Sequence, residues 1–287
     1  MPEGPEVETV RRELLPLINQ KIKKISLTPL SQKYSKYQGE ETRFNQFSGV
    51  VLTNIYRFGK FLVWVFQDSI EPVILNHLGM SGKWCLVSNK EDYLNYVTHP
   101  KVIIETEGPY VAVFDDIRNF GQFRIFPSFD VLKKYPPIKS LGIDGLQDPF
   151  PLEEFLEKLA LSRHHEKVIG ELLLDQKLVA GVGNIYKSES LYLARIHPSR
   201  VVKTLQEEDR RRLGESISII LHKALSDGGS TINNTPYSRP SRVEGEAQYW
   251  HSVYKREGQE CKQCSTPIER IIQKERSTYY CPKCQEF

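Results

Sequence analysis

Four cysteines near the C-terminus have the spacing of a zinc site. Cys261-x2-Cys264 and Cys281-x2-Cys284 are two close pairs separated by sixteen residues, a pattern typical of four-thiolate zinc sites. Four protein ligands leave no position for a substrate water, so the zinc would be structural. We therefore predict one structural Zn²⁺ and no catalytic metal or organic cofactor. Two disulfides are the alternative, which the intracellular features described below disfavour.

The residues between the cysteine pairs predict a β-hairpin. Residues 268–273 and 278–280 have the composition of strands, with Lys274-Glu275-Arg276-Ser277 at the tip. An arginine at such a tip is suited to hold a phosphate, because its guanidinium can donate two parallel hydrogen bonds. Arg276 is equally compatible with a solvated turn residue on this spacing alone.

The N-terminus, Met1-Pro2-Glu3-Gly4-Pro5-Glu6, is the second candidate for chemistry. Removal of Met1, which a second-position proline generally allows, would leave a secondary amine. Such α-amino groups have an ordinary pKa of about 7.7–8.0, and an adjacent helix start favours the neutral form. A neutral amine can attack an electrophilic carbon and form an iminium, with Glu3 and Glu6 available for proton transfer. Proline and glutamate are also ordinary residues at a helix start, so both interpretations stand here.

An all-β half is predicted to precede a helical half. Residues 5–15 predict a short helix that Pro16 ends or kinks. Runs rich in Val, Ile, Phe and Tyr then indicate an antiparallel sandwich or barrel, at residues 49–56, 61–66, 73–75, 84–87, 102–105, 110–114 and 122–126. Beyond a linker at Tyr135-Pro136-Pro137, helices are predicted at 152–161, 167–178 and 185–194. A further helix would begin at Thr204, through a capping box with Glu207, and end at Gly228-Gly229.

Length and composition are those of an ordinary globular protein. The 287 residues are 39% hydrophobic and 26% charged, and suggest about two domains. The net charge of +3 is small for a nucleic-acid-binding protein. We find no apolar run long enough to span a membrane and no signal-peptide pattern at the N-terminus. These features predict an intracellular protein with no membrane partner.

Five short motifs occur in order along the whole chain. They are Met1-Pro2-Glu3-Gly4-Pro5-Glu6-Val7-Glu8-Thr9, His77-Leu78-Gly79-Met80-Ser81-Gly82, Asp116-Ile117-Arg118-Asn119-Phe120-Gly121, Gly181-Val182-Gly183-Asn184-Ile185-Tyr186 and the four-cysteine tail. Each motif alone is weak, but their order argues against coincidence. Together they resemble the formamidopyrimidine-DNA glycosylase/endonuclease VIII (Fpg/Nei) family.

The resemblance implies an α+β fold with three domains. These are an N-terminal antiparallel β-sandwich with flanking helices (1–135), a helical domain with a helix–two-turn–helix motif (136–248) and a four-cysteine zinc-finger hairpin (249–287). It also implies a monomeric base-excision repair enzyme, a bifunctional DNA glycosylase/AP lyase, with damaged double-stranded DNA held between domains.

The resemblance also implies roles for single residues. Pro2 attacks C1′ of the damaged nucleotide and displaces the base, Glu3 shuttles protons, and the Schiff base breaks down by β- and δ-elimination. Lys60 and Arg276 belong to the catalytic set as phosphate contacts near the lesion. Asn184 and the amides of residues 181–184 would hold a phosphate at a helix start. A solvated loop lysine and an ordinary helix N-cap are the alternatives for Lys60 and Asn184.

The remaining implied contacts concern the flipped nucleotide and its surroundings. Met80, Arg118 and Phe120 would fill the hole that the nucleotide leaves in the stack. Met80 and Phe120 could instead be core residues. His77 is implied to contact phosphate, with a core histidine as the alternative, and Glu6 belongs to the same DNA-binding set.

Features of both branches of the family occur in the chain. Met80, Arg118 and Phe120, and the stretch Gly228-Gly229-Ser230-Thr231, resemble the formamidopyrimidine branch, whereas Gly4 and Gly170 resemble endonuclease VIII. Residues 232–249 lack the Asp-Gly…Gly-Tyr-Phe pattern of the 8-oxoguanine-recognising loop, and Lys187 stands where a small residue is usual. We therefore expect oxidised pyrimidines and formamidopyrimidines to be preferred over 8-oxoguanine.

A protein of the same fold that performs no chemistry is the alternative function. It would be a zinc-finger DNA-binding or damage-recognition protein. The joint presence of Pro2, Glu3, Lys60 and Asn184 argues against it.

Overall fold

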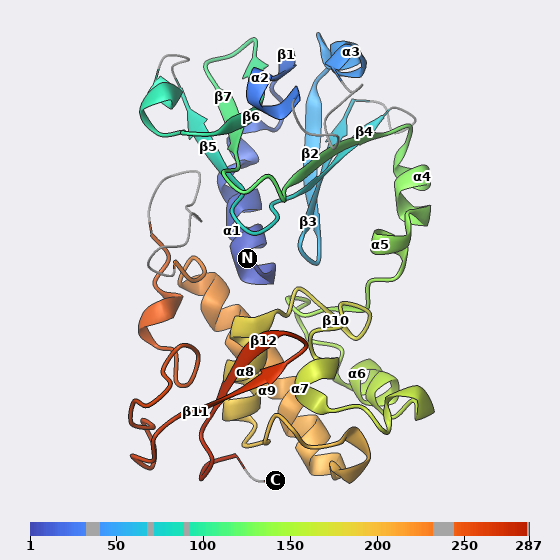
Figure 1. Ribbon diagram of the computed structural model, residues 1–287. Coiled ribbons are helices and arrows are strands. Elements are labelled where there is room, and N and C mark those ends of the chain that lie inside the picture. The colour runs from blue at the N-terminus through green and yellow to red at the C-terminus, as the bar shows by residue number, and fades with distance from the viewer. Residues whose placement is uncertain (33–40, 68–71, 89–91, 232–243, 286) are drawn as a thin grey trace. The chain divides into compact units, whose positions relative to one another are not determined.

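A computed structural model describes all residues except 33–40, 68–71, 89–91, 232–243 and 286 (Figure 1). The described chain forms two compact units. The first contains Met1–Pro2, Glu6–Lys139 and Gly228–Gly245, and the second contains Glu3–Pro5, Ser140–Asp227 and Glu246–Phe287. Each unit thus combines distant parts of the sequence. The predicted domain ranges 1–135, 136–248 and 249–287 stay a prediction.

Two four-stranded antiparallel sheets form the first unit. The strand orders are β1-β6-β7-β5 and β2-β3-β4-β8. The strands are β1 Ile22–Leu27, β2 Leu52–Phe58, β3 Phe61–Phe66, β4 Val73–His77, β5 Lys83–Val87, β6 Pro100–Thr106, β7 Val111–Asp115 and β8 Gln122–Phe126. The helices are α1 Gly4–Glu13, α2 Pro29–Gln32, α3 Glu41–Phe44, α4 Phe129–Lys134 and α5 Pro136–Lys139, and the 3-10 turns are Leu15–Leu17, Asn45–Phe47 and Asp92–Asn95.

One apolar cluster joins the inner faces of these two sheets. Trp64 of β3 and Trp84 of β5 come from different sheets, and their ring centroids lie 5.0 Å apart. Val7 and Val10 of α1 are buried in the same cluster. Burial of these large rings and aliphatic chains removes apolar surface from water, which is the main force that holds two sheets face to face. The predicted β-sandwich is confirmed.

Helices and a two-stranded hairpin form the second unit (Figure 1). Its elements are β9 Ile143–Asp144, α6 Leu152–Leu159, α7 Ile169–Leu172, β10 Val179–Ala180, α8 Asn184–Leu193, α9 Glu207–Ser226, β11 Glu269–Gln273 and β12 Arg276–Tyr280. The 3-10 turns are Ser162–His164, Val202–Thr204 and Ala247–Tyr249. Strands β9 and β10 pair in parallel, and β11 and β12 pair antiparallel. Among the described helices, none is long and apolar enough to cross a membrane.

The sequence patterns missed three strands, β1 and the two-residue β9 and β10, and overextended one helix. Strand β1 was missed because Lys23 and Lys24 interrupt its alternation, at the point where its pairing with β6 shifts register. The predicted helix 167–178 is only the four-residue α7. The chain then turns, with the Asp175 carboxylate accepting the Lys177 amide at 3.0 Å, and enters β10.

The start of α9 also differs from the prediction. Gln206 and Asp209 form the capping box, and not Thr204 and Glu207. The Thr204 hydroxyl instead donates to the Val201 carbonyl at 2.8 Å, within a preceding 3-10 turn. The predicted stop is confirmed, because Gly228 and Gly229 follow the helix with φ values of 72° and 82°.

Candidate active site

The Glu3 carboxylate is seated on the first amides of α8. It accepts hydrogen bonds from the backbone N–H groups of Gly183 at 2.7 Å, Ile185 at 2.9 Å and Tyr186 at 3.3 Å, and Glu3 is only 3% exposed. A helix N-terminus is a favourable place for a carboxylate, because its amides have no partner within the helix. The prediction that these amides hold a phosphate is therefore wrong for Gly183, since Glu3 occupies its N–H.

Glycines make this seat possible. A Cβ on Gly183 would lie 2.4 Å from the Glu3 Cδ, so any side chain there would displace the carboxylate. Gly181 has a φ of 97°, and its carbonyl accepts the Gly4 amide at 2.8 Å. A Cβ on Gly4 would approach the Gly181 Cα at 3.1 Å. The glycines of this motif thus admit the N-terminal segment of the chain itself.

Pro2 and Glu6 flank this seat along the sequence and belong to the first unit. Pro2 is buried and directly precedes Glu3, two residues before α1 begins at Gly4. Glu6 is buried and accepts the Ser230 amide at 2.7 Å, close to Gly229. Glu6 therefore holds the segment after α9, and its predicted contact with DNA stays a prediction.

Asn184 joins α8 to the zinc hairpin. Its side-chain Nδ2 donates to the Ser277 carbonyl of β12 at 2.7 Å. Its Oδ1 accepts the Lys187 Nζ at 3.0 Å, and the same Nζ donates to the Thr278 hydroxyl at 2.6 Å. The N-cap of α8 is Gly183, so the alternative of Asn184 as an ordinary N-cap is wrong.

Two groups beside this network, Lys187 and Tyr254, have shifted pKa values. Burial lowers the pKa of Lys187 to about 7. The positive charge of Arg276 acts in the same direction, whereas the negative charges of Glu3 and Glu171 oppose the shift. Burial also raises the pKa of Tyr254 to about 12, with the charge of Glu3 acting in the same direction and a hydrogen bond to Asn184 opposing it. In the sequence, Lys187 stands out only as a departure from the family pattern, and no pattern singles out Tyr254.

Arg276 begins a strand and is not within the turn. In the β11–β12 pairing Gln273 is opposite Arg276, so the turn is only Lys274-Glu275 and the predicted four-residue tip is wrong. These two residues have φ values of 46° and 60°, as a type I′ turn requires at both central positions. Arg276 is exposed at this end of the hairpin.

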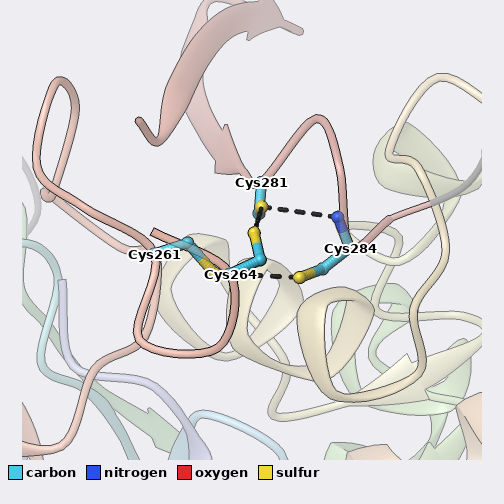
Figure 2. Close-up of side chains that lie close together, drawn as sticks. All are labelled: Cys261, Cys264, Cys281 and Cys284. Carbon is cyan, nitrogen blue, oxygen red and sulfur yellow. Dashed lines mark hydrogen bonds between the residues drawn. The ribbon is translucent and has the colours of Figure 1, made fainter. Parts of the chain in front are cut away.

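The four cysteine sulfurs converge, as Figure 2 shows. All four Sγ atoms lie within 4.8 Å of one another, with 3.5 Å between Cys264 and Cys281 and 3.8 Å between Cys261 and Cys284. A tetrahedral zinc with bonds of about 2.3 Å separates its sulfurs by roughly 3.8 Å. A disulfide needs about 2.05 Å, so the two-disulfide alternative is wrong and the four thiols fit one zinc.

Lys60 is positioned by a tight turn between β2 and β3. Gly59 and Lys60 form the turn, with Gly59 at a φ of 56°, and the Arg57 guanidinium donates to the Gly59 carbonyl at 3.0 Å. Arg57 in turn pairs with Glu8 of α1 at 3.3 Å. Lys60 is 6% exposed, so the solvated-lysine alternative is wrong.

Met80, Arg118 and Phe120 lie on two loops of the first unit that one carboxylate connects. The Asp116 carboxylate accepts the Ser81 hydroxyl at 2.5 Å and the Gly121 amide at 2.7 Å. The Ser81 oxygen accepts the Arg118 amide at 3.1 Å. We call these two loops, residues 79–82 and 117–121 with Asp116, the clasp. Asp116 opens one of the five sequence motifs, but the motif did not predict a role for it.

The clasp leaves its large side chains open to solvent. Met80 is 39% and Phe120 is 47% exposed, so the core alternative is wrong for both. The Arg118 guanidinium lies 5.2 Å from the centre of the Phe120 ring. His77 precedes the clasp, with its Nδ1 accepting the Gly79 amide at 3.0 Å and its ring 4.8 Å from that of Phe61.

The predicted residues therefore divide between the two units. The second unit brings together Glu3, Asn184 and β12 with Arg276, through Lys187 and Thr278, which were not predicted. Pro2, Glu6, Lys60, His77 and the clasp belong to the first unit. Most of the stretch 232–249, on which the prediction about 8-oxoguanine partly depends, lies outside the described residues.

Comparison with known families assigns three segments of the chain. Residues 1–123 match the formamidopyrimidine-DNA glycosylase N-terminal domain, residues 141–235 match its H2TH domain, and residues 258–286 match the zinc finger found in FPG and IleRS.

Whole-chain relatives agree with this assignment. The formamidopyrimidine-DNA glycosylase of Streptococcus mutans is 37% identical over 100% of both chains, and that of Thermus thermophilus is 35% identical over 99% of this chain and 98% of the relative. The solved structure of T. thermophilus MutM (Fpg) has a TM-score of 0.83 at 33% identity, covering 99% of this chain and 98% of that one. Lactococcus lactis Fpg in complex with DNA containing an abasic site has a TM-score of 0.85 at 33% identity, covering 99% and 100%. The chain therefore belongs to the formamidopyrimidine-DNA glycosylase (Fpg/Nei) family of bifunctional DNA glycosylase/AP lyase enzymes.

Proposed function

We propose that this enzyme removes oxidised bases from double-stranded DNA through a Schiff base on Pro2 and then cleaves the abasic strand. The observation that carries the proposal is the seat of Glu3 on the amides of Gly183, Ile185 and Tyr186. Those three hydrogen bonds hold a carboxylate directly next to the residue that becomes the N-terminal amine when Met1 is removed. A nucleophilic amine and a positioned proton carrier are what this reaction requires.

The proposed chemistry proceeds in four steps. The Pro2 nitrogen forms a bond to C1′, and the base leaves with the electron pair of the glycosidic bond, with Glu3 carrying the proton. Opening of the C1′–O4′ bond leaves its electron pair on O4′, which takes up a proton, while the lone pair of the Pro2 nitrogen forms the C=N bond of an iminium. The iminium acidifies the C2′ hydrogens, so loss of a proton expels the 3′ phosphate in β-elimination, and a second elimination expels the 5′ phosphate.

In this proposal the other assigned residues hold the DNA. Lys60, His77, Asn184 and Arg276 contact phosphates, Met80, Arg118 and Phe120 fill the stack, and Glu6 supports the binding site. The enzyme acts as a monomer within the cell, with one structural zinc and no catalytic metal or organic cofactor. The exposed side chains of the clasp and the convergent thiols support these roles.

Oxidised pyrimidines and formamidopyrimidines are the proposed preferred lesions, over 8-oxoguanine. Relatives are named formamidopyrimidine-DNA glycosylase, and solved neighbours include L. lactis Fpg with Fapy-dG DNA and MutM with DNA containing carbocyclic 8-oxo-G. The preference is measured by competition between duplexes that differ only in one lesion. Faster excision of 8-oxoguanine than of both other classes would overturn it.

Borohydride trapping tests the proposed chemistry. A duplex with a single abasic site or thymine glycol is incubated with zinc-loaded, Met1-processed protein and reduced. We expect a covalent protein–DNA adduct that Pro2→Gly and Met1-retaining protein do not form. Binding of the duplex without any adduct would contradict the mechanism and favour the non-catalytic damage-recognition alternative.

A further inference from the structure

Lys187 is a buried lysine that the proposed chemistry does not use. It lies in the first turn of α8, and its exposed fraction is 0%. Burial of an amine without partners is unfavourable, and its two partners come from different elements, Asn184 of α8 and Thr278 of β12.

The two hydrogen bonds connect both proposed phosphate contacts of the second unit. The Lys187 Nζ bonds the Oδ1 of Asn184, and this fixes the side-chain amide with its Nδ2 on the Ser277 carbonyl. The second bond, at 2.6 Å, reaches Thr278, two residues after Arg276 in β12. Lys187 therefore joins the first turn of α8 to the middle of β12.

We propose that Lys187 is a positioning residue of the phosphate-binding site, which holds Asn184 and the strand of Arg276 in one arrangement and adds a positive charge to that site when protonated. The inference rests on the proposed function, because it requires Asn184 and Arg276 to meet DNA phosphates.

The two contributions of Lys187 separate with pH. Burial lowers its pKa to about 7, while Glu3 and Glu171 oppose the shift and Arg276 adds to it. The amine is therefore mostly charged at pH 6 and mostly neutral at pH 8.5. A neutral amine still has two hydrogens for Asn184 and Thr278. Raising the pH thus removes the charge and keeps the link.

Two substitutions distinguish the link from the charge. Lys187→Gln supplies a neutral side-chain amide with two hydrogens, and Lys187→Met has similar length and no donor. Affinity is measured by fluorescence anisotropy at pH 6 and pH 8.5, with constant salt, on a duplex containing one tetrahydrofuran abasic analogue. Lys203→Met is the matched control, because Lys203 is an exposed lysine of the same unit that pairs with Glu166.

We expect Lys187→Met to bind about tenfold more weakly than the natural chain at pH 6, the effect of losing one or two hydrogen bonds. At pH 8.5, Lys187→Gln should bind the duplex as tightly as the natural chain does. On going to pH 6, we expect the natural chain to gain about threefold in affinity and Lys187→Gln to lack this gain. All other ionisable groups remain in this variant, so the difference isolates Lys187.

Equal affinities and equal pH dependence in the natural chain and both variants would overturn the inference. A melting temperature of Lys187→Met close to that of the natural chain excludes simple misfolding. Borohydride trapping with the natural chain is run in parallel. If it forms no adduct, the proposed function fails, whereas an adduct with unchanged variants rejects only the role of Lys187.

Discussion

Glu3 shows how one residue acquires a role from partners far away in the sequence. From the sequence, Glu3 could be either an ordinary acidic residue at a helix start or a catalytic proton carrier. The residues next to it in the sequence do not distinguish these two roles. Its hydrogen bonds to Gly183, Ile185 and Tyr186 hold it in one place at the start of another helix. A proton carrier must be held within hydrogen-bond reach of its target, and this seat provides that restraint.

At the residue scale we predict that Glu3→Gln slows base release much more than it slows lyase chemistry. An abasic site has no base to expel, so its trapping depends less on the proton carrier. Excision of thymine glycol should fall by about 10²- to 10⁴-fold, the range for a general acid–base residue. Single-turnover excision and trapping on an abasic duplex are compared.

The side-chain amide introduced by Glu3→Gln would turn one donor toward the α8 amides, at a cost of about 1–3 kcal/mol in stability. Melting temperatures therefore accompany the kinetics of this variant. Equal losses of excision and of abasic-site trapping would argue against a role in base release.

The clasp is the clearest example of positioning by whole elements. Two loops at the ends of the sandwich strands place Met80, Arg118 and Phe120 at the surface, and the buried Asp116 carboxylate connects the loops through Ser81 and Gly121. Gly79, with a φ of 68°, allows close contact, since a Cβ there would lie 2.5 Å from the Phe120 carbonyl carbon. Met80, Arg118 and Phe120, which we call the wedge residues, can insert between stacked bases only if their loops hold them rigidly in place.

At the element scale we predict that Asp116→Asn loosens the clasp. The new amide would point a donor at either Ser81 or Gly121, so at least one hydrogen bond is lost, worth about 1–3 kcal/mol. Affinity for lesion-containing duplex should fall roughly tenfold or more relative to undamaged duplex.

Competition binding measures this loss of discrimination. Asp130→Asn is the control, because Asp130 is an exposed aspartate of the same unit that pairs with Lys133. If both variants retain the discrimination of the natural chain, the clasp does not position the wedge residues.

The whole molecule depends on two different sources of stability. The sandwich contains a large apolar cluster with Trp64, Trp84, Phe114 and Phe123. Among the described residues, the zinc hairpin packs around a small cluster, built from its own cysteines with Tyr192, Val253 and Ile268. So small a core does not fold a hairpin by itself, and zinc ligation supplies the remaining free energy of folding.

At the scale of the whole molecule we predict that zinc removal abolishes DNA binding and leaves the sandwich folded. Metal analysis should find one zinc for each chain, and a chelator that removes it should release β12 and Arg276. The near-ultraviolet circular dichroism of the Trp64–Trp84 pair, 5.0 Å apart, should persist. Zinc addition restores binding if the loss is specific, and undiminished DNA binding by zinc-free protein would contradict the prediction.

The sequence by itself determined the sandwich, most helices and the four thiol ligands. Alternating β-type runs, helical spacing and the cysteine spacing are local, and local patterns report local structure. It did not reveal β1, whose Lys23 and Lys24 break the alternation, or the true turn at Lys274-Glu275.

Only the tertiary structure decided which groups meet. The amides around Asn184 suggested a phosphate, but those of Gly183, Ile185 and Tyr186 hold the carboxylate of Glu3, about 180 residues away in the chain. Lys187 could be noted as unusual, yet its burial between Asn184 and Thr278 and its lowered pKa follow from packing alone. Hydrogen bonds and desolvation depend on distances between atoms in space, and the spacing of residues along the sequence does not give these distances.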